Sequence, residues 1–292
     1  MAGFSIDTAL KSGFGLARRQ PLAVLVWGVV YALVGLLTEA IAAGPALPEY
    51  LRLLQDDPDG AALFLEKAAE ANGLIALGPM LLVSAMAAAL VHGAVARALL
   101  HPEERGFFFM RLSRRELWLG LTVLVLAMAM VAIAFAAGMV VILISMAGAL
   151  WGVLAGVILA IGVLYLAVRF STAWVQAFDE RRLVLRDAWR LTKGQGWRLV
   201  LLVLALLFLI LILSAVVLIP AGVMAMVLFG VAGVAGGSAS TLVGVVTLLV
   251  LLVLASGFYG LILTLSIAAM VEVYRALSAT RLPGGEAAEV LA

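Results

Sequence analysis

Long runs of apolar residues dominate the chain and predict its architecture. Five runs are clear: Pro21–Ala43, Leu74–Leu100, Leu117–Ser145, Leu199–Ile219 and Leu242–Val271. A sixth run, Leu150–Ala173, is interrupted only by Arg169. About 20 apolar residues cross the hydrocarbon core of a bilayer as a helix, whereas barrel strands would alternate over about ten residues. The pattern therefore predicts an all-α membrane protein with six transmembrane helices, in one integral membrane domain over residues 1–292.

One stretch of the pattern leaves two alternatives open. Pro220 ends or kinks the fifth run, because proline disrupts the helical hydrogen bonding around it. The uncharged segment Ala221–Gly237 that follows is short for a hairpin of its own. It forms either a re-entrant or interfacial piece or an outward extension of the helix.

Composition excludes most soluble and catalytic classes. Hydrophobic residues make up 65% of the chain and charged residues 12%, against about 25% charged in a soluble domain. The chain has no cysteine and two histidines, His92 and His101, so thiolate catalysis and Cys-rich or His-rich metal sites are excluded. We find no Ser-His-Asp order, no paired inner carboxylates and no phosphate-binding glycine loop. We expect no catalytic residue, no cofactor and no metal, and no nucleic-acid partner.

The distribution of basic residues predicts the orientation of the chain. Of its 19 Lys and Arg residues, 15 fall before the first run, between the second and third, between the fourth and fifth, or after the sixth. Arg97 and Arg169 lie at the ends of the runs that adjoin these segments, and the other side has only Arg52 and Lys67. Basic residues concentrate on the cytoplasmic side of membrane proteins. We therefore expect both termini in the cytoplasm and place the protein in a bacterial inner (plasma) membrane.

This orientation divides the parts outside the membrane into two groups. The cytoplasmic parts are an amphipathic helix over 1–20, amphipathic segments over 101–116 and 179–197, and a tail over 276–292. The periplasmic or extracellular loop covers 44–73. Within that loop, Asp57-Pro58-Asp59-Gly60 predicts a turn, with Asp59 as the N-cap of a short helix.

Three cytoplasmic segments resemble one another and indicate an internal repeat. They are Phe14-Gly15-Leu16-Ala17-Arg18-Arg19-Gln20-Pro21, Met110-Arg111-Leu112-Ser113-Arg114-Arg115-Glu116-Leu117 and Trp189-Arg190-Leu191-Thr192-Lys193-Gly194-Gln195-Gly196. Aligned on Leu16, Leu112 and Leu191, each reads Leu, a small residue, a base, a base or Gly, then Gln or Glu. The second helix of each pair ends alike at Arg97 and Arg275, with Arg169 as a weaker copy.

The repeat predicts three transmembrane hairpins, each preceded by an amphipathic interfacial helix. The alternative is chance, because membrane proteins in general place bases at the cytoplasmic ends of their helices.

The third segment also carries a family resemblance. The stretch Ala188-Trp189-Arg190-Leu191-Thr192-Lys193-Gly194-Gln195-Gly196-Trp197-Arg198 follows an Arg at a helix end, Arg169, and precedes the next apolar run. It resembles the membrane domain found with some glycerophosphoryl diester phosphodiesterases and in stand-alone bacterial membrane proteins. The specific match covers Arg169–Leu202. The resemblance implies a helical membrane module and no activity, because the phosphodiesterase is a separate soluble domain that we do not expect here.

The basic residues of these segments are the candidate binding site. They are Arg18, Arg19, Arg114, Arg115, Arg182, Arg186, Arg190 and Lys193. In the predicted helix Arg181–Lys193 the last four recur every three to four residues and share one face, which suits an interfacial helix facing anionic headgroups. The alternative is that these bases only fix topology.

Ionisable residues within membrane spans are functional candidates by default. Here His92 and Glu272 lie at similar depth and, with Arg97 and Arg275 nearby, are expected to form one polar cluster, for which the alternative is a structural clasp between helices. Small residues at four-residue spacing, Gly148, Gly152 and Gly156 in one span and Ala85, Ala89 and Gly93 in another, favour close packing within the chain, with dimerisation as the alternative.

Together these features predict a non-catalytic scaffold or accessory protein of the membrane. Its expected partners are anionic lipid headgroups or another protein, and a homo-oligomer remains open. The alternative function is a small transporter or lipid translocator with a cavity between the hairpins.

Overall fold

The computed structural model describes residues 4–44, 48–49, 52–53, 57–104, 106–235 and 237–279. These residues form helices and connecting turns, with no strand among them. The elements are α1 (Ile6–Arg19), α2 (Pro21–Ala43), α4 (Pro58–Leu100), the 3-10 helix η2 (Phe107–Phe109), α5 (Arg114–Ser145), α6 (Ala149–Phe170), α7 (Ala173–Glu180), α8 (Leu185–Leu191), α9 (Gly196–Ala235) and α10 (Gly237–Ala279). Six helices are long and apolar enough to cross a membrane, which confirms the predicted class.

The three predicted amphipathic segments form different structures from one another. α1 forms most of residues 1–20 and begins at Ser5, whose side chain accepts from the Thr8 amide. Between α4 and α5 the described residues contain only η2 and turns, so no regular amphipathic helix fills 101–116. In 179–197 the helix is shorter than predicted, because α8 covers Leu185–Leu191 and the chain turns on either side of it. The tail beyond Ala279 lies outside the described residues.

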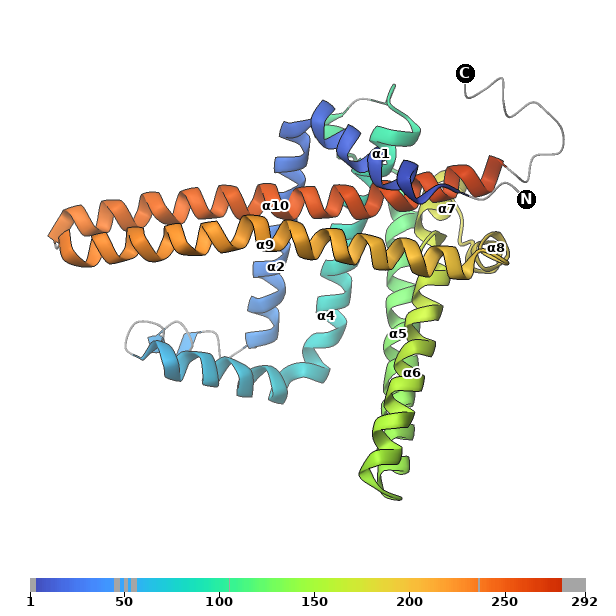
Figure 1. Cartoon of the computed structure of the whole chain (residues 1–292), viewed down its shortest axis with the longest axis horizontal. Helices are drawn as coiled ribbons and strands as arrows, with labels where there is room; N and C mark the ends of the chain where they lie inside the picture. The colour runs from blue at the N-terminus through green and yellow to red at the C-terminus, as the bar shows by residue number, and fades with distance from the viewer. Residues whose placement is uncertain are drawn as a thin grey trace.

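α4 corrects the prediction for the loop over 44–73. This helix has 43 residues, and its N-cap is Asp57 rather than Asp59. The Asp57 side chain accepts from the Gly60 amide at 3.1 Å. Pro58 occupies the first helical position, where proline needs no amide partner. The predicted short helix therefore merges with the second span, and α4 bends in Figure 1, with Pro79 in its interior.

α9 and α10 are also longer than the predicted spans. α9 has 40 residues and contains Pro220, so the segment after Pro220 extends the helix instead of re-entering the membrane. At 1.5 Å per residue α9 is about 60 Å long, roughly twice the thickness of a bilayer core. α10 has 43 residues and packs along α9.

The long helices run in two directions. In Figure 1, α2, α5 and α6 run together with the C-terminal part of α4, and the α9–α10 pair lies across them. α10 makes the crossing, with contacts to α1, α2 and α4, while α5 packs on α4, α6 and α7. α10 is therefore the element that joins the first helices of the chain to the last.

Small residues let α2 and α10 approach until their backbones touch. A Cβ atom on Gly28 would lie 1.7 Å from the Ser256 carbonyl oxygen, and one on Gly260 would lie 2.0 Å from the Val24 carbonyl oxygen. Ser256, Gly260, Thr264 and Ala268 form a buried row at four-residue spacing along α10. This is the small-residue pattern of close helix pairs. This row was not predicted from the sequence, unlike the rows on α4 and α6.

The two predicted rows also pack within the chain. Gly152 of α6 faces Ser145 at the end of α5. A Cβ on Gly120 of α5 would lie 3.1 Å from Ala89, and Gly93 faces Glu116. Both rows therefore serve intramolecular helix contacts.

We predict that Gly28→Ala destabilises the protein, because the added Cβ would overlap the Ser256 carbonyl and push the helices apart. Overpacking of this kind costs about 1–3 kcal/mol. The matched control is Gly35→Ala on the same helix, where a Cβ meets no atom within 4 Å. Thermal unfolding in detergent should show a lower midpoint for Gly28→Ala alone. Equal midpoints for the two variants would contradict the observed crossing.

Candidate functional site

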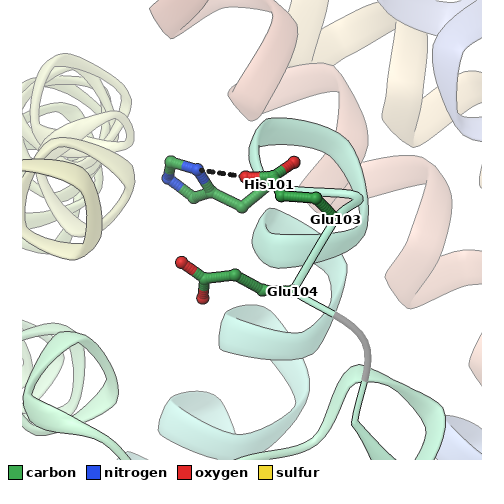
Figure 2. A group of neighbouring side chains, drawn as sticks. All are labelled: His101, Glu103 and Glu104. Atoms are coloured by element: carbon green, nitrogen blue, oxygen red, sulfur yellow. Dashed lines mark ion pairs between the residues drawn. The ribbon is translucent and has the colours of Figure 1, made fainter.

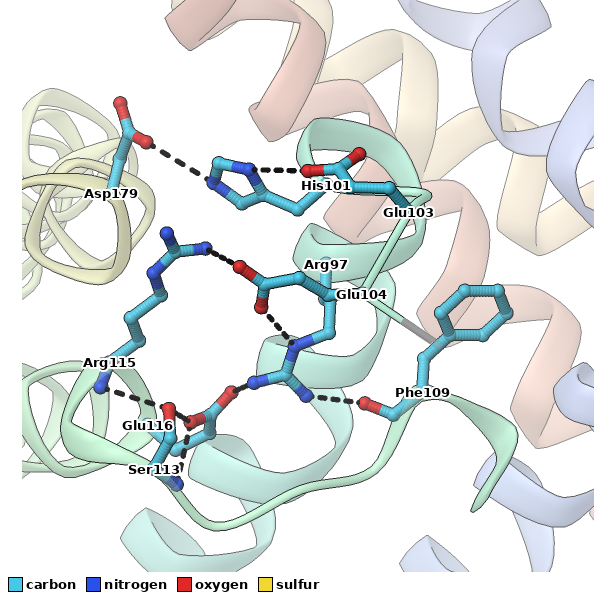
Figure 3. Close-up of polar contacts among 9 residues, drawn as sticks. All are labelled: Arg97, His101, Glu103, Glu104, Phe109, Ser113, Arg115, Glu116 and Asp179. Carbon is cyan, nitrogen blue, oxygen red and sulfur yellow. Dashed lines mark hydrogen bonds and ion pairs between the residues drawn. The ribbon is translucent and has the colours of Figure 1, made fainter. Parts of the chain in front are cut away.

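Charged and polar side chains gather at one end of the molecule. We call this the basic end and define it as α1, residues 101–116, α7, α8 and the ends of the long helices that adjoin them. Most of the candidate residues lie here, and Figure 3 shows its central network. The network is built from the C-terminus of α4, the N-terminus of α5 and the turn that joins them.

Arg97 is the centre of this network. It lies in the last turn of α4 and is 1% exposed. Its guanidinium forms an ion pair with Glu116 of α5 and donates to the Phe109 carbonyl at 2.6 Å. Its Nε lies 3.4 Å from the Glu104 carboxylate. A buried charge is tolerated only when it is paired and hydrogen-bonded, and Arg97 meets both conditions.

Glu116 is equally buried and begins α5. It belongs to a capping box, in which the Ser113 side chain caps the helix and the Ser113 amide donates to Glu116 at 2.9 Å. The Ser113 hydroxyl also contacts this carboxylate. The sequence Ser113-Arg114-Arg115-Glu116 carries the capping-box signature, so the N-terminus of α5 is specified locally. Glu116 was predicted only as a position of the repeat, and its pairing with Arg97 was not predicted.

The turn before α5 has an unusual backbone conformation where it contacts Arg97. Phe108 and Phe109 have φ values of 49° and 62°, in the left-handed region that bulky residues rarely occupy. Their carbonyls are both used, because Phe109 accepts from Arg97 and Phe108 accepts from the Trp27 indole at 3.0 Å. These contacts hold the strained turn and connect α2 to α4 and α5.

The network extends from Arg97 to α7. Arg115 pairs with Glu104 at 3.1 Å, so Glu104 joins two guanidinium groups. The ring of Phe178 in α7 lies 5.9 Å from the Arg97 guanidinium carbon and 5.8 Å from that of Arg115. Both distances suit a cation–π contact, which favours cations over a ring face.

Asp179 connects α7 to two further elements. His101 lies 3.6 Å from Asp179, and Tyr274 of α10 donates to Asp179 at 2.8 Å. The network therefore joins α4, α5, α7 and α10 at one end. The ion pairs and hydrogen bonds among its members hold these helices together.

One group within the network has the spacing of metal ligands. Ligand atoms of His101, Glu103 and Glu104 lie within 4.8 Å of one another, and Figure 2 shows them projecting from the turn after α4. Glu104 already forms ion pairs with Arg97 and Arg115. Two guanidiniums at that carboxylate oppose a divalent cation there.

Arg169 forms a second buried centre at the end of α6. It is 8% exposed and donates to the Trp189 carbonyl at 2.8 Å and to the Thr192 hydroxyl at 3.4 Å. Its guanidinium carbon lies 3.8 Å from the centre of a Trp189 ring. The Thr192 hydroxyl is also 3.2 Å from the Arg169 carbonyl. Arg169 thus fixes α8 to the end of α6.

A cavity of about 480 Å³ opens between α1, the end of α4 and the end of α10. Lys11, Arg19 and Arg275 contribute its positive charges, and Glu272 contributes its negative charge. Glu272 lies 3.7 Å from Arg275 on the same helix. The charge of this cavity is therefore mainly positive.

The eight predicted basic residues fall into two groups. Arg115 and Arg182 are paired, and Arg182 lies 2.9 Å from Asp187 and 2.6 Å from Glu180. The Glu180 hydrogen bond raises the pKa of Arg182 above its ordinary value. The other six are exposed, and the described contacts include no ion pair for them: Arg18, Arg19, Arg114, Arg186, Arg190 and Lys193.

The predicted cluster of His92, Arg97, Glu272 and Arg275 is divided among three sets of partners. His92 packs against Trp174, with ring centres 5.1 Å apart. Arg97 pairs with Glu104 and Glu116, and Glu272 faces Arg275. No described hydrogen bond or ion pair joins His92 to Glu272.

Comparisons with known proteins add no relative: no protein-family model, no curated protein and no solved structure matches the chain.

We predict that Glu116→Leu destabilises the fold strongly, because it leaves the Arg97 guanidinium buried without its carboxylate. Removing one partner of a buried pair costs about 3–5 kcal/mol. The double variant Arg97→Leu/Glu116→Leu should lose less than the sum of the single changes, since it removes both charges. Thermal unfolding in detergent measures all three.

The exposed pair of Asp7 and Lys11, at 2.6 Å, supplies the control for this cycle. Lys11→Gln should change stability by at most about 1 kcal/mol, as exposed pairs do. Strictly additive losses at Arg97 and Glu116 would show that the two residues are not coupled.

Proposed function

We propose that this chain is a non-catalytic membrane protein whose basic end binds anionic lipid headgroups, as a scaffold or accessory subunit. One observation carries the proposal. Six basic side chains of the basic end are exposed and have no ion pair among the described contacts: Arg18, Arg19, Arg114, Arg186, Arg190 and Lys193. They lie beside helices that are long and apolar enough to span a bilayer.

The buried and exposed bases have different uses in this proposal. Arg97 and Arg169 donate hydrogen bonds to carbonyl groups within the protein and hold helices together. The exposed bases have hydrogen-bond donors that face outward and can bind groups outside the protein. Each base near an anionic leaflet contributes on the order of 1 kcal/mol to binding, so several together give a stable contact.

We propose that the basic end faces the cytoplasm, with both termini there, in a bacterial inner membrane. The excess of Lys and Arg at this end supports the orientation. Helices that span one bilayer tilt by about 0–40° from its normal. Six spans in one bilayer therefore require a smaller angle between the α9–α10 pair and the other long helices than the crossing in Figure 1 shows.

A threefold repeat of hairpins is part of the same proposal. Arg97 ends α4 and contacts Glu116 in the second aligned segment, and Arg169 ends α6 and contacts Thr192 in the third. Both arginines thus engage the segment that follows them in sequence. The resemblance to the membrane domain of glycerophosphoryl diester phosphodiesterases agrees with a membrane module that has no reaction of its own.

The transporter alternative has weaker support. A transport path needs polar groups that face a cavity within the membrane. The buried hydroxyls of Thr122 and Thr264 instead donate to carbonyls of their own helices, those of Trp118 and Gly260. Such bonds satisfy the hydroxyls locally and offer nothing to a passing solute.

We predict that single cysteines report the proposed orientation. The chain has no cysteine of its own, so Glu49→Cys and Lys193→Cys are clean probes, and both positions are exposed. In cells with an opened outer membrane, an impermeant maleimide should label the first variant at once and the second only after lysis. The reverse pattern would overturn the orientation.

We predict that the triple variant Arg186→Gln/Arg190→Gln/Lys193→Gln loses co-purifying anionic phospholipid by at least about fivefold. Lipid content per protein is measured by mass spectrometry after purification in neutral detergent. The reason is the loss of three exposed charges from one face of the basic end.

Arg182→Gln is the matched control, because two carboxylates already hold the Arg182 guanidinium. It should retain the wild-type lipid content. Wild-type retention by the correctly inserted triple variant would reject lipid binding by these bases, and loss of a co-purifying protein instead would point to an acidic protein partner.

A further inference from the structure

The three arginines at the aligned helix ends have different surroundings. Arg97 and Arg169 are 1% and 8% exposed, and each is bonded by the next aligned segment. The side chain of Arg275 is 40% exposed. Its described partner is Glu272, one turn earlier on its own helix, at 3.7 Å. The third arginine therefore lacks the partner that encloses the other two.

The aligned residues explain the difference. Counted from the aligned leucine, the partner of Arg97 is the fourth residue on, Glu116, and the partner of Arg169 is the first residue on, Thr192. The same positions after Leu16 hold Ala17 and Gln20, which supply a methyl group and a neutral amide. Neither provides a carboxylate or a hydroxyl to a guanidinium.

A cavity occupies the place of the missing partner. It measures about 480 Å³ and is bounded by Leu16, Arg19, Gln20 and Arg275, with Lys11 and Glu272 at its wall. This volume falls within the range of ligand pockets, about 300–1,000 Å³. Lys11 is held by Asp7 at 2.6 Å, so Arg19 and Arg275 stand against the single carboxylate of Glu272, and this balance favours an anion. The planar guanidinium fork of arginine matches phosphate oxygens in particular.

We infer that this cavity binds a phosphate-bearing anion, whose phosphate takes the position beside Arg275 that Glu116 takes beside Arg97 and Thr192 takes beside Arg169. The inference rests on the proposed function and specifies one site within it. The phosphate is supplied by an anionic phospholipid or by a soluble phosphate, and both present the same oxygens to Arg19 and Arg275.

The test uses the full-length protein in neutral detergent and counts bound molecules by native mass spectrometry. Three probes are titrated separately: phosphatidylglycerol, phosphatidylcholine and inorganic phosphate. Wild type should bind one anionic probe in preference to phosphatidylcholine. Arg275→Gln should weaken that binding by at least about fivefold, the effect of one base near an anionic group.

Gln20→Glu provides an independent variant that keeps every base. It introduces a carboxylate at the position that Glu116 occupies in the second segment, so it should occupy the cavity in place of the anion and weaken binding similarly. Gln20 makes no side-chain capping bond, so the change leaves the start of α2 intact. Arg182→Gln is the control, since two carboxylates already hold Arg182 and it lies outside the cavity, so this variant should bind as wild type does.

The outcomes separate this inference from the proposed function. Preference for phosphatidylglycerol that depends on Arg275 supports both and identifies a lipid source. Binding of inorganic phosphate alone, again dependent on Arg275, supports the cavity and rejects lipid binding. Preference for phosphatidylglycerol that Arg275→Gln leaves unchanged, as Arg182→Gln does, overturns the cavity and leaves the proposed function standing. Binding of neither anion rejects both.

Discussion

The burial of the Arg97 guanidinium away from water constrains the positions of the residues around it. A buried cation is tolerated only with a carboxylate and further acceptors in fixed positions, and these come from Glu116, Glu104 and the Phe109 carbonyl. The first turn of α5 must therefore lie against the last turn of α4. The connecting turn must also point its carbonyls inward, although this forces two phenylalanines into left-handed backbone. One ion pair thus determines the angle at which α5 leaves α4.

The opposite half of the molecule follows a different physical rule. Between α2 and α10 no charge is involved, and the absence of side chains at Gly28 and Gly260 lets the two backbones touch. Lipid tails are as apolar as leucine, so close packing rather than hydrophobic burial favours this contact. Polar bonds therefore fix the helices at the basic end, and small residues fix them within the apolar region. The hydrogen bond from Tyr274 of α10 to Asp179 of α7 connects the region held by polar bonds to the region held by small residues.

The sequence predicts the features that depend on local patterns. Apolar runs predicted the six long helices because length and hydropathy are properties of each segment alone. The extension of α9 past Pro220 was one of two predicted alternatives, and the predicted N-cap at Asp59 was wrong because α4 begins after Asp57. Helix ends are hard to predict because several neighbouring residues can cap a helix. The partners of Arg97 were not predicted, although Ser113 and Glu116 carried a readable capping signal. The meeting of Gly28 with Gly260 depends on tertiary packing over more than half the chain, which no local pattern encodes.

The length of α9 and α10 has a consequence for the membrane itself. A helix whose apolar stretch exceeds the local hydrocarbon thickness tilts, bends or thickens the bilayer around it. α9 carries no charged residue beyond Arg198, so no charged side chain marks where it should leave the lipid. Its preferred depth is then set by the bilayer and not by the chain. In a bilayer that this hairpin spans, its free energy therefore depends on the hydrocarbon thickness and is lower where the bilayer is thicker.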